Sequence, residues 1–177
     1  MITKRIDVEA LPPVIGTLYP SPLDEPCRTR RRTRIGNAAD LTQFGVNFVR
    51  LPPGAWSSQR HWHTETDELV YVLSGELVLV TEGAEEILRA GEAAGFKAND
   101  PNGHHLQNRS SEDATFLEIG TRVAGDAATY PDVDLVSPPH QQPALYTHRD
   151  GTPYPKRERS GRDAITALSI HVTGGHG

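Results

Sequence analysis

Cysteine is nearly absent from this chain. Cys27 is the only cysteine in 177 residues, so a disulfide cannot form within one chain. Proteins of oxidising compartments commonly carry paired cysteines, and the lack of a pair favours a reducing compartment. We therefore expect a cytoplasmic protein.

Long apolar segments are missing as well. The N-terminal segment 1–7 carries two basic residues, one acidic residue and no apolar core of the kind that a secretory signal peptide needs. No apolar run approaches the roughly 20 residues required to cross a bilayer. The sequence therefore predicts no membrane partner.

A basic surface suited to nucleic acids is not indicated by the bulk charge. The formal net charge is -5, whereas a nucleic-acid-binding domain is usually basic, so we expect no nucleic-acid partner. The exception is Arg28–Arg34, which holds five arginines. Such a run can attract an anionic substrate or a phosphate, or it can be a solvated edge strand whose charges discourage aggregation. We favour the solvated edge strand.

Three segments differ in composition. Residues 1–43 form an arm in which five prolines make a continuous helix unfavourable. Residues 44–120 contain closely spaced apolar and β-branched runs separated by short turns, as in an antiparallel barrel or jelly roll. Residues 121–177 form an extension rich in proline, glycine and charge, with one apolar segment at 165–172 that could be a strand. The chain therefore predicts one all-β domain with an arm that packs on the barrel or on a partner subunit.

Two histidines and a glutamate stand at spacings typical of a metal site. In a strand, residues i and i+2 face the same way, so His61 and His63 project together. Glu68 opens a β-branched and aromatic run that favours a strand and can aim back at both histidines. Gln59 shares the parity of the two histidines and is a candidate substrate-binding residue inside the barrel.

A fourth ligand is expected after the next two hairpins. His104 and His105 follow a loop rich in turn residues, and adjacent strand residues face opposite ways. Only one of them is therefore expected to reach a common metal. Strand parity alone does not decide between the two.

These motifs resemble those of the cupin superfamily. The first cupin motif is matched by Gly54, His61-Trp62-His63, Glu68 and Gly75, with one extra residue before the first histidine. The second cupin motif is matched by Gly91, His104 and Asn108, with two extra residues in the loop. The resemblance reaches roughly from residue 36 to 154 and is nearest to small single-domain bacterial cupins, mostly uncharacterised or loosely named sugar-isomerase-like. It implies a double-stranded β-helix with one divalent metal per chain, held by His61, His63, Glu68 and His104. It also implies a homodimer, because the N-terminal strands of similar proteins often pair with a second subunit.

The metal and the reaction are left open by the sequence. Imidazoles suit Fe, Ni and Zn, and the carboxylate adds affinity for Mn, so these four are candidates. A Lewis-acid route would isomerise, or eliminate from, a small sugar-phosphate or keto-acid substrate, and we favour it slightly. An Fe(II)-dependent dioxygenase and a non-catalytic small-molecule sensor are the alternatives. No catalytic base can be named. Asp67 and Gln59 are candidates for orienting the histidines.

Overall fold

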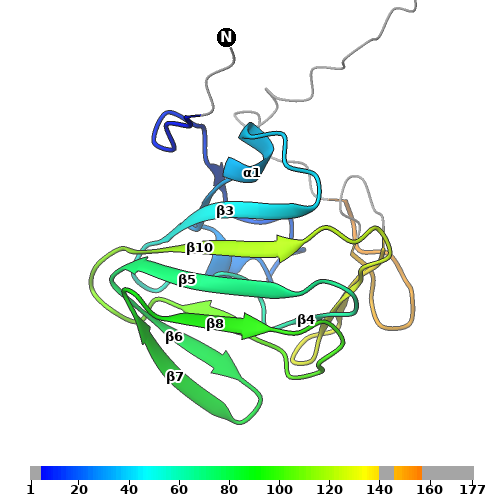
Figure 1. Ribbon diagram of the computed structural model, residues 1–177. Coiled ribbons are helices and arrows are strands. Elements are labelled where there is room, and N and C mark those ends of the chain that lie inside the picture. Colours follow the sequence, from blue (N-terminus) through cyan, green and yellow to red (C-terminus); the bar gives the residue numbers. More distant parts are fainter. Residues whose placement is uncertain (1–4, 140–145, 157–177) are drawn as a thin grey trace, which may run out of the picture.

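The computed structural model describes residues 5–139 and 146–156, and these form a barrel of antiparallel strands (Figure 1). The apolar segment at 165–172 lies outside the described residues. The described helices are short, namely the 3-10 helix η1 (Glu25–Cys27) and α1 (Ile35–Ala38). None of them is long and apolar enough to cross a bilayer. The expected all-β class is confirmed.

The strands of the described residues are arranged in three hydrogen-bonded sheets. A six-stranded sheet has the order β1-β2-β3-β10-β5-β8, and two three-stranded sheets have the orders β12-β11-β4 and β7-β6-β9. The strands run as follows: β1 Val14–Ile15, β2 Arg31–Thr33, β3 Phe44–Leu51, β4 Trp62–His63, β5 Glu68–Ser74, β6 Glu76–Thr81, β7 Ala84–Arg89, β8 Ala93–Phe96, β9 His105–Gln107, β10 Ala114–Thr121, β11 Ala128–Tyr130 and β12 Leu135–Ser137. Neighbours far apart in sequence, such as β3 and β10, give the sheet its jelly-roll connectivity.

Both flanking segments contribute strands to the barrel. β1 and β2 come from residues 1–43 and extend the six-stranded sheet beyond β3. β11 and β12 come from residues 121–177, and β11 pairs with β4 next to the paired histidines. The arm thus packs on the barrel of its own chain. The three-part division into arm, barrel and extension stays a prediction.

Strand alternation separates a packed interior from an apolar exterior. On β5, Val70 and Val72 are 6% and 0% exposed, whereas Leu69, Tyr71 and Leu73 are 39–41% exposed. The interior holds a cluster of buried apolar side chains. Leu51 and Phe116 come from the six-stranded sheet, and Leu77 and Leu106 come from the β7-β6-β9 sheet. Because burial of apolar area is the main stabilising contribution to folding, this cluster holds these two sheets together.

The interpretation of Arg28–Arg34 as a solvated edge strand is wrong. β2 pairs with β1 on one side and with β3 on the other, so it is not an edge. Alternation then divides the run between two faces. Arg30 is only 6% exposed and Arg32 is half-buried on the inner side, whereas Arg31 is exposed on the outer side. The count of charges in the run could not reveal this division, because it depends on the pairing of β2 inside the sheet.

Candidate metal centre

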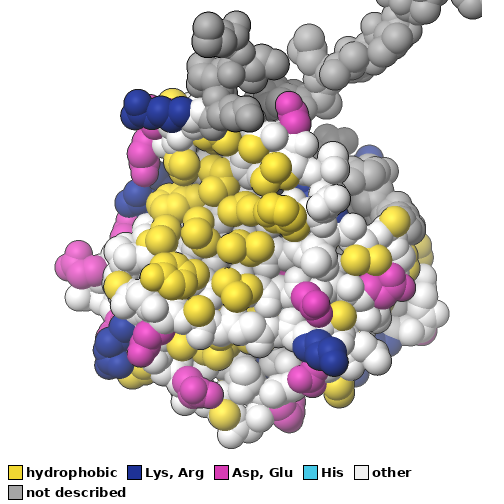
Figure 2. Space-filling view, in the orientation of Figure 1, with side chains coloured by type: hydrophobic (Ala, Val, Ile, Leu, Met, Phe, Trp, Pro, Cys, Tyr) yellow, Lys and Arg dark blue, Asp and Glu magenta, His cyan; other side chains and the backbone are white. Residues whose placement is uncertain are grey.

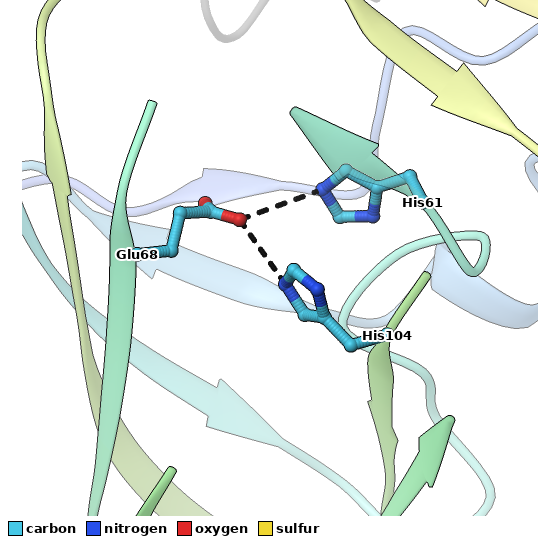
Figure 3. Close-up of side chains that lie close together, drawn as sticks. All are labelled: His61, Glu68 and His104. Atoms are coloured by element: carbon cyan, nitrogen blue, oxygen red, sulfur yellow. Dashed lines mark ion pairs between the residues drawn. The ribbon is translucent and has the colours of Figure 1, made fainter. Parts of the chain in front are cut away.

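The two sequence motifs meet through a short backbone bridge. The backbone N–H of His104 donates to the carbonyl of His61 at 2.8 Å, and the N–H of His61 donates back at 3.1 Å. His63 ends β4 two residues later, and Glu68 is the first residue of β5 on the neighbouring sheet. Figure 3 shows Glu68 facing His61 and His104 from the opposite strand. Long-range pairing therefore assembles the site.

One carboxylate oxygen is the point on which three imidazoles converge. Glu68 Oε2 lies 3.1 Å from His104 Nε2, 3.5 Å from His63 Nε2 and 4.0 Å from His61 Nε2. The ligand atoms of His61, Glu68 and His104 all lie within 4.8 Å of one another. His63 lies beside this group through the same oxygen. All four expected ligands are thus brought together.

The donor set fits a divalent cation. Glu68 Oε2 is buried, and no hydrogen bond to it with acceptable geometry occurs within the described chain, although His104 Nε2 is close. A buried carboxylate oxygen without a donor is costly. A cation bound between this oxygen and the neutral Nε2 atoms would remove the cost, and mixed imidazole and carboxylate ligands are ordinary for transition metals.

The protonation states suit such a cation. Burial, opposed by the charge of Glu68, lowers the pKa of His61 to about 3, so its imidazole is neutral near pH 7. Burial would raise the pKa of Glu68, but the three facing imidazoles outweigh it and lower this pKa to about 2. A neutral imidazole and an ionised carboxylate are the forms that bind a metal.

Two of the histidines are oriented by acceptors on their far side. The Nδ1–H of His61 donates to the carbonyl of Gln59 at 2.9 Å, and the Nδ1–H of His63 donates to Asp126 Oδ2 at 2.5 Å. With the proton on Nδ1, the Nε2 lone pair is free to face Glu68 and a cation. Such outer contacts fix the ring and raise its basicity.

Asp126 is the site residue that the sequence did not reveal. It lies 63 positions after His63 and is held in place by the backbone N–H groups of Glu65 and Thr66, at 2.9 and 3.1 Å. Burial would raise the pKa of Asp126, but these donors and His63 lower it. No local motif marks it, because the pairing of β11 with β4 brings it to the site.

The two sequence candidates for orienting residues behave differently. Asp67 Oδ1 accepts the backbone N–H of Ala98 at 2.8 Å and is exposed, so it does not hold a histidine ring. Gln59 acts through its carbonyl, while its side-chain Nε2 donates to the carbonyl of Leu23 at 2.7 Å. The side chain of Gln59 therefore points away from the expected substrate position. The prediction assumed that Gln59 lies in the same strand as the two histidines. It lies before β4, which begins at Trp62, so the alternation of a strand does not apply to it.

His104 and His105 face different surroundings, as alternation required. His104 points at Glu68, and its Nδ1 has no hydrogen-bond partner among the described residues. His105 donates from Nδ1 to the carbonyl of Ser58 at 2.9 Å, and its Nε2 lies 2.9 Å from Gln107 Nε2. The side-chain Nδ2 of Asn108 donates to the carbonyls of Leu51 and Glu112. His104 thus faces Glu68 with the other two histidines, whereas His105 and Asn108 hold the loop.

A cavity of about 350 Å³ opens on the four candidate ligands. Its volume is in the range of small-molecule sites, which is about 300–1,000 Å³. Tyr130 forms one wall, with its ring stacked on His61 at a centroid distance of 5.5 Å and an angle of 22°. The site is therefore reachable by a small molecule.

Comparison with known proteins agrees with this architecture. The family model described as "Cupin domain" matches residues 47–120. The crystal structure of a sugar phosphate isomerase from a cupin superfamily, from Silicibacter pomeroyi DSS-3, is 42% identical, covers 85% of this chain and 96% of its own, and has a TM-score of 0.81. A protein from Acidithiobacillus ferrooxidans ATCC 23270 is 27% identical over 78% of this chain and 82% of its own, with a TM-score of 0.62. The polyketide cyclase RemF from Streptomyces resistomycificus, 18% identical over 68% of this chain and 80% of its own with a TM-score of 0.56, shares the fold alone. No curated protein matches the chain significantly.

Proposed function

Because this chain belongs to the cupin superfamily, we propose that it is a metal-dependent enzyme of the isomerase or lyase type acting on a small polar oxygenated substrate. One observation carries the proposal. The buried oxygen Glu68 Oε2, which accepts no hydrogen bond within the described residues, faces three imidazole nitrogens in a small-molecule cavity. The name of the Silicibacter relative supports sugar phosphates, with keto acids as the chemically similar alternative.

His61, His63, Glu68 and His104 are the residues that would hold the metal. Held there, a divalent cation would supply Lewis acidity toward a substrate carbonyl and its adjacent C–H group. The histidines contribute neutral donors and Glu68 contributes one negative charge. The Fe(II) and dioxygen route remains the competing reaction on the same ligands.

The remaining residues of the site bind and orient. Asp126 and the Gln59 carbonyl hold two rings with Nε2 forward, so the ligand set is preorganised before substrate enters. The stacked ring of Tyr130 excludes water from one side of His61. Within the described residues, Tyr130 hydrogen-bonds with Tyr19 and Tyr146, and burial raises its pKa well above the usual value, so it stays protonated. A protonated phenol cannot act as the base.

Elemental analysis of the purified protein and of His61→Ala tests the proposal. We expect about one equivalent of Mn, Ni, Zn or Fe per chain in the wild type and its loss in His61→Ala and in His63→Ala, because each replacement removes a ligand. Ile87→Ala is the control and should retain the metal, because the Ile87 side chain is 49% exposed on β7 and lines no cavity with the ligands. Full occupancy in both histidine variants would overturn the assignment.

The identity of the metal then separates the reactions. A redox-inactive metal together with turnover of a sugar phosphate or keto acid supports the isomerase or lyase route. Iron together with substrate-dependent oxygen uptake would support the dioxygenase instead. Tight ligand binding without turnover under either condition would support a sensor.

A further inference from the structure

The cavity that opens on the metal ligands is also lined by three arginines. Arg30, Arg32 and Arg34 all face it, whereas Arg31 and Thr33 line a separate depression on the outside of the sheet. This alternation is the ordinary two-residue period of a strand. The inward positions of one short segment thus place three guanidinium groups beside a candidate metal centre.

The charges lining this cavity do not cancel. Its carboxylates in the described chain are Glu68 and Glu118, which leaves one positive charge in excess, and a bound dication would add two more. The whole chain has the opposite sign, with a net charge of -5. A buried positive cavity in an acidic protein concentrates the field on a small anion.

The three arginines are engaged to different extents. Arg30 has two terminal nitrogens on the carbonyls of Ser57 and Gly16, so it contributes charge more than contact. No carboxylate within the described residues lies at ion-pair distance from it, and burial lowers its pKa to about 10, which leaves it charged at neutral pH. An unneutralised buried cation favours an anionic ligand nearby.

Arg32 retains a donor for a ligand, and Arg34 places a second guanidinium group at the cavity. Arg32 Nη2 donates to Glu118 Oε2 at 2.7 Å, while the other oxygen of Glu118 accepts from Asn47 Nδ2 at 2.9 Å. Arg32 Nε is buried without a hydrogen-bond partner in the described part of the chain. Arg34 is exposed and lies at the mouth of the cavity. A guanidinium group presents five N–H donors in a planar fork that matches phosphate and carboxylate oxygens.

We propose that Arg32 and Arg34, with the buried charge of Arg30 behind them, form a subsite for the oxyanion group of the substrate, a phosphate monoester or a carboxylate. This assignment rests on the proposed function for the reacting end of the substrate. The metal ligands hold the oxygenated end, and the arginines hold the anionic end. The pair of contacts would fix the orientation of a small molecule in the cavity.

Titration calorimetry with inorganic phosphate tests the subsite on the full-length protein after metal removal by a chelator. We expect wild type to bind phosphate, and Arg32→Gln and Arg34→Gln each to weaken it about tenfold or more. Arg31→Gln is the matched control, because it removes the same charge from the same strand on the outer face. It should stay within about twofold of wild type, because Arg31 does not line the cavity. Acetate as a second titrant distinguishes a carboxylate from a phosphate subsite.

The outcomes separate this inference from the proposed function. Absence of binding of both anions, or equal weakening by Arg31→Gln and Arg32→Gln, would overturn the subsite. Phosphate binding that appears only with metal and ignores Arg32 and Arg34 would also overturn it. Arginine-dependent binding in a protein that takes up no metal would uphold the subsite and refute the metal enzyme. Thermal melts of each variant verify folding. If Arg32→Gln does not fold, phosphate binding by Arg34→Gln, at the exposed mouth of the cavity, tests the subsite.

Discussion

At the scale of single residues, the site depends on acceptors behind the ligands. His61 donates to a backbone carbonyl, which side-chain substitution cannot remove, whereas His63 donates to the carboxylate of Asp126. A charge-assisted hydrogen bond is roughly twice as strong as a neutral one. Mutation of Asp126 can therefore test how the orientation of His63 affects the site, whereas the acceptor of His61 cannot be removed in this way.

Asp126→Asn should weaken metal binding by about 10- to 100-fold, as is usual when an outer hydrogen-bond partner of a ligating histidine is changed. Competition with a coloured chelator would measure the affinity. Asp67→Asn is the control, because Asp67 is close in sequence to the ligands but its carboxylate accepts only from the backbone N–H of Ala98 within the described residues. Equal loss in the two variants would contradict the role of Asp126.

His104→Ala should reduce metal affinity, whereas His105→Ala should reduce folding stability. His104→Ala should lower metal affinity by more than about tenfold while leaving His105 and its contacts intact. His105→Ala should retain the metal but lose about 1–3 kcal/mol of unfolding free energy, since the buried Ser58 carbonyl and Gln107 amide lose a partner. Metal analysis and urea denaturation of the same samples would measure both effects. A greater loss of metal in His105→Ala than in His104→Ala would make His105 the fourth ligand.

At the scale of elements, turns and strand pairing determine where these residues lie. The β5–β6 hairpin turns at Gly75, which has a φ of 75°. A Cβ there would lie 3.0 Å from Cα and Cβ of Ala114 on β10. Glycine is thus required twice, for its backbone conformation and for the close approach of the neighbouring strand. The hairpin keeps Glu68 in register with the inner face.

Gly75→Ala should destabilise the protein more than Gly83→Ala. Both glycines have positive φ, at 75° and 71°, and alanine in the left-handed region costs about 1–2 kcal/mol. Only Gly75 adds a steric conflict, because nothing lies within 4 Å of a Cβ at Gly83. Chemical denaturation would give both free energies, and equal losses would show that β10 moves aside easily.

At the scale of the whole molecule, the outside of the six-stranded sheet is apolar. We call this surface the outer apolar face, and Figure 2 shows it as a continuous patch over β3, β10 and β5. By strand alternation and register, it consists of Phe44, Val46, Phe48, Leu69, Tyr71, Leu73, Leu117 and Ile119. Extended apolar patches on soluble domains commonly mark interfaces. The arm already packs on its own barrel, so the expected homodimer has this face as its natural contact.

We propose that two copies associate through the outer apolar face, since a two-fold axis lets the same apolar patch of each copy cover the other. Light scattering at micromolar concentration should give a dimer for the wild type and a monomer for the double variant Leu69→Glu and Tyr71→Glu. Ile87→Glu is the control, because Ile87 is 49% exposed on β7 away from this face. A monodisperse wild-type monomer would count against the homodimer.

Local patterns in the sequence determined the strand class and the ligand set. The common direction of His61 and His63 and the strand-forming run after Glu68 depend on short-range geometry, whereas the choice of His104 over His105 rests on the resemblance of His104-x3-Asn108 to the second cupin motif. Alternation along the backbone is the same in any strand, so these features could be inferred before any pairing was known. Their use as metal ligands stays a prediction until a metal is measured.

Only the tertiary structure decided which distant residues share the site. Asp126 reaches His63 because β11 pairs with β4, and Arg30, Arg32 and Arg34 face the cavity because β2 lies between β1 and β3. The side chain of Gln59 turns away because the strand begins after it. These outcomes depend on which strands pair and in which register. Strand pairing and register depend on the apolar area buried over the whole barrel, so they cannot be inferred from any short segment of the sequence.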